Sequence, residues 1–163
     1  AIPALSWILS MRTLALLLFT ALLGLAQDPP NLSGNWTINA KTSDFAKQPP
    51  YSMRYLVDHH GTELEYEIFH GTPPNESMGK LKYVLNGEEG EVTAQGNPLK
   101  YKAHWQGQVL VVETWGSFGT NDIKLVDRWQ LQSGGKGLLI ERHYEGPGGP
   151  QDQKLRFDNV PKK

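Results

Sequence analysis

The stretch Leu99-Lys-Tyr-Lys-Ala-His-Trp105 alternates apolar and polar residues at every position. Successive side chains of a β-strand point to opposite faces of the sheet. Leu99, Tyr101, Ala103 and Trp105 therefore share one face, while the two lysines and the histidine share the other. This pattern is typical of an antiparallel sheet that packs one face on a core and leaves the other in water.

Similar short segments follow one another from Leu32 onward, separated by Gly, Pro or Asn at intervals of about 8–12 residues. Asn86-Gly87 and Gln106-Gly107 are tight-turn sequences of the kind that join hairpin strands. The chain therefore predicts an all-β, antiparallel, up-and-down meander of eight to ten strands, with at most a short helical turn at Thr42–Lys47. The ten expected strands are Gly34–Ala40, Tyr51–His59, Glu63–Phe69, Lys80–Leu85, Glu91–Ala94, Leu99–Trp105, Val109–Ser117, Ile123–Gln132, Leu138–Tyr144 and Lys154–Asn159.

Alternation also assigns an inner face to three later strands, and each of these faces carries one ionisable residue. The three residues are Glu113, Asp127 and Arg142. An ionisable group on an otherwise apolar face needs a partner of opposite charge or a ligand. The sets are Val109, Val111, Glu113 and Trp115; Ile123, Leu125, Asp127, Trp129 and Leu131; and Leu138, Ile140, Arg142 and Tyr144.

The first 26 residues have a different character from the rest of the chain. Met11-Arg12 provides a short basic region, and Leu14–Gly24 is an apolar run. Gly24 and Ala26 then fit the −3 and −1 positions of a signal-peptidase site, with cleavage before Gln27. We expect residues 1–26 to be upstream residues plus a signal peptide, and residues 27–163 to form a single β-barrel domain. If the segment is retained, it is the one part that could enter a membrane.

The composition narrows the functional classes further. A chain of 163 residues fits one domain with a sizeable core. A net charge of −1, without a basic patch, gives no indication of nucleic-acid binding. The absence of cysteine excludes disulfides, thiolate nucleophiles and thiolate metal sites. An exported protein without disulfides suits the bacterial periplasm better than it suits a small extracellular module.

The segment Leu32-Ser-Gly-Asn-Trp36 at the start of the first strand resembles the Gly-x-Trp opening of lipocalins and the wider calycin group. The resemblance implies a lipocalin-like barrel whose floor is closed by Trp36, with Arg142 or Arg156 as the basic residue packed across it. Together with Lys41–Phe45 and Asp127–Leu131, this opening also resembles small exported lipocalin-like proteins of acidobacteria. A periplasmic or secreted bacterial protein is then expected.

Such a barrel implies binding of a small apolar or amphipathic ligand. Aromatic side chains along the strands, with a few polar groups among them, are how small-molecule sites are commonly built. Arg142 would either fix an anionic head group or pair with Asp127 or Glu113. The expected ligand-binding residues are Arg142, Glu113, Asp127, Tyr101, Trp115, Trp129 and Tyr144.

We expect no catalytic residues, metal or cofactor. The five histidines form no His-x-His pair and no His-Glu-x-x-His motif, and no Gly-x-Ser-x-Gly element is present. Two alternatives remain. One is an envelope structural or interaction protein with a dry core. The other is a barrel-based isomerase or hydrolase, for which His143 or Glu113 would be the first candidates.

Overall fold

A computed structural model describes residues 27–161, and these form ten antiparallel strands in a single meander. The predicted fold class is confirmed. The expected signal peptide lies outside the described residues. The strands are β1 (Gly34–Ile38), β2 (Met53–His60), β3 (Glu63–His70), β4 (Ser77–Val84), β5 (Glu89–Ala94), β6 (Asn97–Gln106), β7 (Val109–Phe118), β8 (Asn121–Gln132), β9 (Gly137–Glu145) and β10 (Gln151–Asn159).

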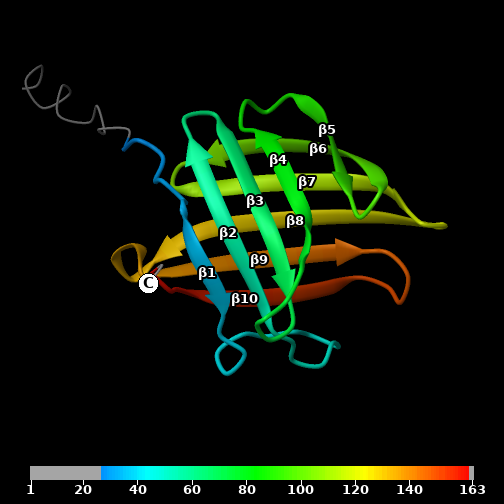
Figure 1. Cartoon of the computed structure of the whole chain (residues 1–163). Helices are drawn as coiled ribbons and strands as arrows, with labels where there is room; N and C mark the ends of the chain where they lie inside the picture. The colour runs from blue at the N-terminus through cyan, green and yellow to red at the C-terminus, as the bar shows by residue number, and fades with distance from the viewer. Residues whose placement is uncertain (1–26, 162–163) are drawn as a thin grey trace, which may run out of the picture.

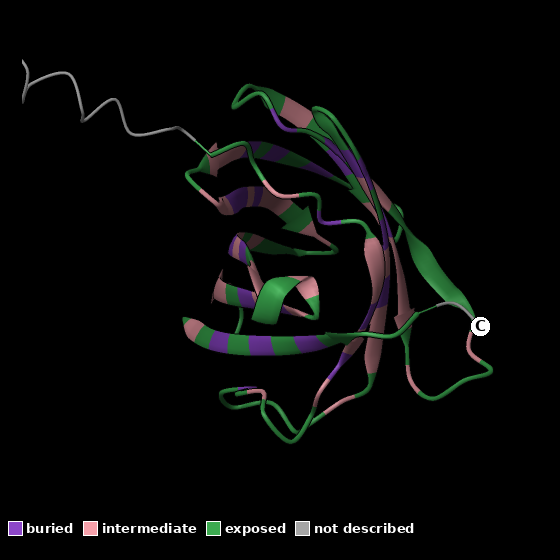
Figure 2. Ribbon diagram, turned by 90° about the vertical axis from the view of Figure 1, so that its left-hand side faces the viewer, coloured by how far each residue is buried: buried purple, intermediate pink, exposed green. Residues whose placement is uncertain are grey.

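The ten strands form one sheet in the order β4-β3-β2-β1-β10-β9-β8-β7-β6-β5. Pairing of β1 with β10 joins the two ends of the meander, so the sheet curves into a nearly closed barrel. Strands β1–β4 cross in front of β6–β10, and the core lies between these two parts (Figure 1). Buried and exposed residues alternate along the strands, as expected for a barrel with a packed interior and a wet outer face (Figure 2).

The barrel has one seam, between the edge strands β4 and β5, which lie at the two ends of the hydrogen-bonded order. Tyr101 of β6 reaches across this seam, and the backbone N–H of Val84 in β4 donates to its hydroxyl at 2.9 Å. The ring passes over Gly90 of β5, where an added Cβ would lie 2.6 Å from a Tyr101 ring carbon. A side-chain hydrogen bond thus replaces ladder pairing at this point.

One end of the barrel is closed by tightly packed side chains. Trp36 is 1% exposed, and its indole Nε1–H donates to the carbonyl of Leu32 at 2.9 Å. The backbone N–H of Leu32 donates in turn to His59 Nδ1 at 3.1 Å. The indole also covers Gly34, where a Cβ would lie 2.9 Å from the ring. The Gly-x-Trp sequence is therefore explained by a direct contact between its two named residues.

The opposite end is open and is bordered by the connection between β1 and β2. Strand β1 pairs with only the last residues of β10, and Asp44 of the connection then bridges to Lys154 further along that strand. This places Phe45 inward, where it is buried and packs against Tyr51 with ring centroids 4.6 Å apart. Residues 39–52 thus form part of the wall that β1 is too short to supply.

The connection contains turns at residues 40–42 and 46–47 but no helix. The described residues contain one short 3-10 turn, η1 (Ser133–Gly135). Strands β4 and β10 begin three residues earlier than the sequence predicts, at Ser77 and Gln151. Within residues 27–161, no helix has the length and hydropathy needed to cross a membrane.

Candidate functional site

A buried ion pair occupies the middle of the barrel. Asp127 of β8 and Arg142 of β9 are direct cross-strand partners, and both belong to the inward-facing residues of their strands. The guanidinium donates from Nε to Oδ1 at 2.8 Å and from Nη2 to Oδ2 at 2.7 Å. The Arg142 side chain is 18% exposed and that of Asp127 is 8% exposed. This two-point geometry is the strong form of an arginine–carboxylate pair.

The pair holds Arg142 firmly in its charged form. Burial acts to lower the pKa of the guanidinium, but the Asp127 carboxylate outweighs it by attraction and hydrogen bonding, and the pKa of Arg142 lies well above its usual value. The Tyr55 hydroxyl lies close enough to Arg142 for the positive charge to act on it. Burial raises the pKa of the Tyr55 hydroxyl, and Arg142 only partly opposes that effect.

Four buried aromatic residues pack beside the ion pair. Tyr55 stacks on Trp129 at 5.9 Å between ring centroids, and Tyr66 meets Trp129 edge-on at 5.2 Å. Tyr83 continues the group and stacks on Tyr66 with ring centroids 6.0 Å apart. Burial raises the pKa of Tyr83 to about 12, although the neighbouring Tyr66 and Thr114 side chains lower it in part. These phenols therefore stay uncharged at neutral pH.

A cavity of about 320 Å³ opens from this polar layer toward the open end. The residues that line it from the inner face of the sheet are Leu125, Arg142, Tyr144, Gln151 and Gln153. Two loop residues, Gln48 of the β1–β2 connection and Pro147 of the β9–β10 hairpin, complete its edge. Half-buried apolar side chains surround the same end of the barrel: Tyr51, Met53, Ile68, Leu81, Ala94, Phe118 and Ile123.

Five of the seven predicted ligand-binding residues lie inside the barrel, although not all of them line the cavity. Asp127 and Arg142 form the ion pair, and Tyr144 stands beside the cavity with Arg142. Tyr101 and Trp129 are buried in the aromatic core away from it. Whether any of these residues contacts a ligand stays a prediction.

Glu113 and Trp115 lie on the outer face, so the face assigned to β7 from the sequence is wrong. The inward residues of this strand are Leu110, Val112 and Thr114, with Val112 directly beside Asp127. Glu113 instead lies between Lys102 and Val126 on the outside. Apolar residues occupy both faces at the start of β7. Even the outward-facing Val111 is covered, with only 3% of it exposed. Glu113 therefore cannot join the buried ion pair.

The structure adds interior residues that the sequence reasoning missed. Gln153 is buried and donates from Nε2 to the carbonyl of Phe45 at 3.1 Å, which connects β10 to the β1–β2 connection. Tyr55 of β2 lies near Arg142 inside the barrel. The sequence pattern that could have identified Tyr55 as an inward residue is its alternation with Val57 and His59 in β2. The lone glutamine carried no such signal.

Trp36 is buried inside the barrel, and its role as a lipocalin-type floor stays a prediction; neither expected arginine covers it in the expected way. Arg142 is engaged with Asp127. Arg156 is exposed on the outer face of β10, where its backbone N–H bonds the hydroxyl of Ser43. Within residues 27–161, the cation–π contact is that of Arg54 over Phe69, at 3.8 Å.

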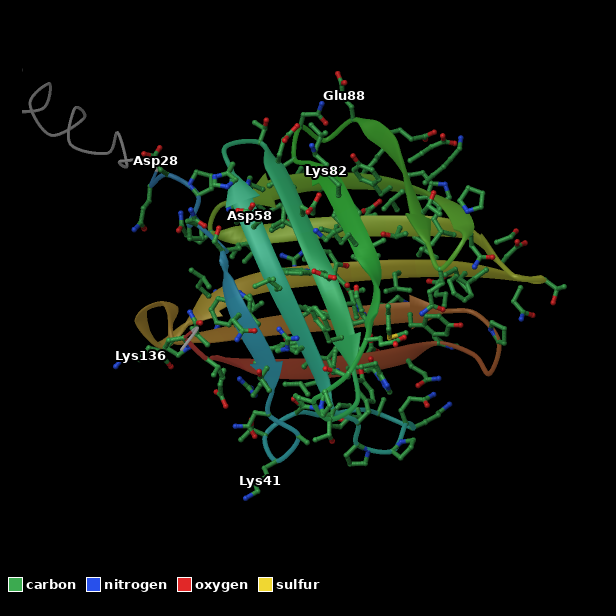
Figure 3. The ribbon with its side chains drawn as sticks, in the orientation of Figure 1. Asp28, Lys41, Asp58, Lys82, Glu88 and Lys136 are labelled. Atoms are coloured by element: carbon green, nitrogen blue, oxygen red, sulfur yellow. The ribbon has the colours of Figure 1, made fainter. Side chains whose placement is uncertain are left out.

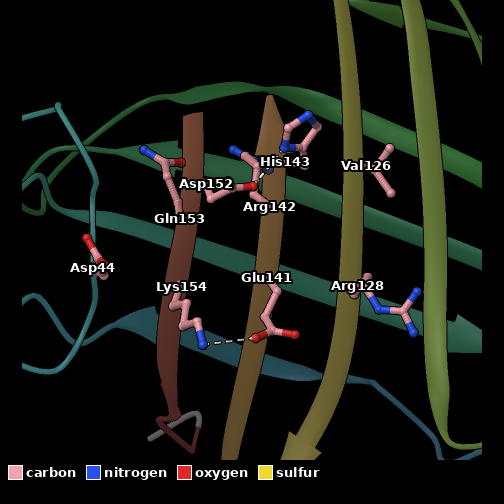
Figure 4. Close-up of a pocket in the computed structure, with 9 residues that line it drawn as sticks. All are labelled: Asp44, Val126, Arg128, Glu141, Arg142, His143, Asp152, Gln153 and Lys154. Atoms are coloured by element: carbon pink, nitrogen blue, oxygen red, sulfur yellow. Dashed lines mark hydrogen bonds and ion pairs between the residues drawn. The ribbon is translucent and has the colours of Figure 1, made fainter. Parts of the chain in front are cut away.

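The outer surface offers a second hollow, of about 350 Å³, over β8–β10 (Figure 4). Its side chains are mostly charged and already paired: Lys154 with Glu141 at 3.4 Å, and His143 with Asp152 at 2.7 Å. The charged side chains that are labelled in Figure 3 also point away from the barrel interior. The described part of the chain contains no group of three His, Asp or Glu residues suited to a metal ion.

The sequence matches no protein-family model and none of the curated proteins. Its fold, however, is that of several solved barrels. The "REP1-NXSQ fatty acid transporter" is similar with a TM-score of 0.56 and 11% identity, over 81% of this chain and 98% of that one. The zebrafish ileal bile acid-binding protein complexed with cholic acid has a TM-score of 0.57 and 14% identity, over 78% and 98%.

A third similar structure is the secretory abundant heat soluble protein 4 from Ramazzottius varieornatus. Its TM-score is 0.54 with 16% identity, over 83% of this chain and 99% of that one. At these identities the likeness establishes the fold alone. The chain thus shares an antiparallel β-barrel fold with these proteins, and its own barrel has ten strands.

Proposed function

We propose that the protein binds a small apolar or amphipathic molecule in the open half of its barrel. The observation that carries this proposal is the cavity of about 320 Å³, whose lining combines the polar Arg142, Gln151 and Gln153 with the less polar Leu125, Tyr144 and Pro147. This volume is at the lower end of the range for ligand sites. The apolar part of the ligand would lie against Leu125 and Pro147, and its polar part near Arg142 and Gln153.

The names of two structurally similar proteins support this proposal. One is a fatty acid transporter and the other is a bile acid-binding protein. Within this chain, the closed half of the barrel is packed solid around Trp36, so the space for a ligand lies at the other end. A barrel with a dry core throughout would leave no such cavity. The envelope structural role is therefore the weaker alternative.

Filling the cavity tests the proposal directly. Leu125 lines the cavity from β8, so Leu125→Trp should abolish binding of the uncharged dye Nile red, measured by its fluorescence in titrations of delipidated protein. The neighbouring Lys124 is exposed on the outer face of the same strand. Lys124→Trp introduces the same side chain outside the barrel and should leave binding intact.

Two results would overturn the proposal. The first is wild-type protein that binds no Nile red and releases no molecule on denaturation, as judged by mass spectrometry. The second is equal binding by the Leu125→Trp and wild-type proteins. A ligand that binds the native state should also raise the melting temperature, by mass action.

We further propose that the protein is exported to a bacterial periplasm and is a relative of the acidobacterial lipocalin-like proteins. The support is the segment Met11–Ala26 and the three sequence elements that carry the resemblance. Expression of the whole chain in a Gram-negative host should yield periplasmic protein that begins at Gln27. Intact-mass measurement tests this, and uncleaved protein in the membrane fraction would contradict it.

We infer that the protein is not an enzyme. The two residues named as candidates for acid–base chemistry, His143 and Glu113, are both on the outer face and do not share a pocket. A pair of titratable groups held in one cleft is the usual requirement for such chemistry.

A further inference from the structure

One charged residue, Arg142, lines the ligand cavity, and its pairing with Asp127 limits the ligands that fit there. Arg142 lines the cavity, but two of its nitrogens already bond the Asp127 carboxylate, at 2.8 and 2.7 Å. An anion arriving at Arg142 would therefore also meet the negative charge of Asp127 nearby. For an incoming charged group, the attraction of Arg142 and the repulsion of Asp127 largely cancel.

The remainder of the described interior adds no charge to this balance. The buried polar residues besides Asp127 are His59, Thr114 and Gln153. His59 accepts a hydrogen bond at Nδ1 from the backbone N–H of Leu32, which leaves Nε2 to donate to the carbonyl of Gly61 at 3.1 Å. That pattern belongs to a neutral imidazole. The buried tyrosines beside the pair have raised pKa values and are also neutral.

A buried anion needs a compensating positive charge, whereas a hydroxyl or carbonyl needs only hydrogen-bond partners. The cavity offers partners of the second kind, because Gln151, Gln153 and Tyr144 all line it with Arg142. The ion pair does not use Nη1 of Arg142, but a carboxylate bound there would add a second negative charge to a guanidinium that Asp127 already neutralises. The geometry therefore favours an uncharged polar head.

We propose that the ligand is a neutral amphiphile, such as an alcohol or ester with an aliphatic chain, and that Asp127 excludes the corresponding carboxylate. This inference rests on the proposed function. It separates this chain from the fatty-acid and bile-acid binders that share its fold, whose ligands are acids.

The test compares heads on one chain length. 1-Decanol, methyl decanoate and decanoate displace Nile red from wild-type protein at pH 8, where decanoate is ionised. The alcohol and the ester should each bind at least about tenfold more tightly than decanoate, because a buried unpaired charge is disfavoured. Equal or tighter binding of decanoate would overturn the inference and leave the proposed function standing. If Nile red and all three compounds fail to bind, the proposed function falls, and the inference with it.

Asp127→Asn examines the cause of the selectivity. It keeps a hydrogen-bond acceptor beside Arg142 but removes the negative charge, so decanoate should now bind more tightly than decanol. The matched control is Asp122→Asn, an exposed carboxylate on the same strand, which should retain the wild-type order. Folding of each variant is checked by circular dichroism. If Asp127→Asn does not fold, the wild-type comparison of decanoate with its methyl ester still decides, because the ester removes the charge and adds only one methyl group.

Discussion

At the scale of single residues, Gly34 shows how a glycine is required without any special backbone conformation. It is needed because the Trp36 indole lies on it, so that a Cβ would be only 2.9 Å from the ring. Gly34→Ala should therefore destabilise the protein by about 1–3 kcal/mol through overpacking. Urea denaturation measures this.

Gly137→Ala is the matched control, because it is also a glycine in a strand and a Cβ there would lie 3.4 Å from Gln132, an ordinary contact. A loss of stability at Gly34 no larger than at Gly137 would show that the indole moves aside easily. The Gly-x-Trp sequence could be recognised as significant from the residues alone. The contact that explains it required the structure.

His143 is a second residue-scale case. Asp152 and, more weakly, Glu145 hydrogen-bond its two ring nitrogens on the outer face and raise its pKa. Because the folded-state pKa is raised, its contribution to stability is complete below the unfolded value of about 6.5 and is lost as pH rises through the folded-state pKa. An NMR titration should give a pKa above that of a free histidine.

Asp152→Asn removes the larger cause and should move this pKa back toward the free value. Asp58→Asn, far from His143 in the register and paired with His60, serves as the control and should leave it unchanged. An unaltered titration of His143 in the Asp152 variant would contradict the assignment.

At the scale of strands, the sequence was informative where apolar residues fall on one face only. β6, β8 and β9 have the inward faces that alternation assigns them. β7 does not, because Val109–Val112 is apolar at every position and gives no phase. The neighbouring strands decide it: the register places Val112 beside Asp127 and Ala103 on the inside. No pattern within β7 itself contains this information.

The seam between β4 and β5 gives a prediction at this scale. Tyr101→Phe keeps the ring that packs over Gly90 but removes the acceptor for the Val84 N–H. The loss should be about 0.5–1.5 kcal/mol, the net value of one hydrogen bond. Hydrogen exchange should accelerate most at the Val84 amide.

Tyr144→Phe removes a hydroxyl at the open end of the barrel and is the control for this experiment. Exchange at Val84 should be the same as in the wild type. Equal acceleration by both substitutions would mean that the seam does not depend on the Tyr101 hydroxyl.

At the scale of the whole molecule, the free energy of unfolding depends on the pairing of the buried charges of Asp127 and Arg142. Replacing Asp127 by Leu leaves a buried guanidinium without its partner, and should cost about 3–5 kcal/mol in the free energy of unfolding. The double substitution Asp127→Leu with Arg142→Met removes both charges and should recover most of this loss. Urea denaturation of the two single variants and the double variant measures the coupling.

The barrel itself could be predicted from its hairpin spacing, whereas its cavity could not. A closed meander of this strand number is compatible with a filled or a hollow interior. Which half is filled depends on the short β1, on Phe45 folding inward beside it, and on the hydrogen bond from Gln153 to Phe45. These are contacts between segments far apart in the sequence, so local patterns do not reveal them.

The seam also bears on self-association. Exposed sheet edges are templates on which other copies of a chain can add strands and aggregate. In this barrel the two edge strands lie next to each other, and Lys80, Lys82 and the positive-φ Gly79 interrupt the β4 edge with charge and an irregular backbone. A barrel whose seam is loosened would present Ser77–Val84 to its neighbours. It should then form aggregates below its melting temperature, detectable by light scattering, while the intact barrel stays monodisperse.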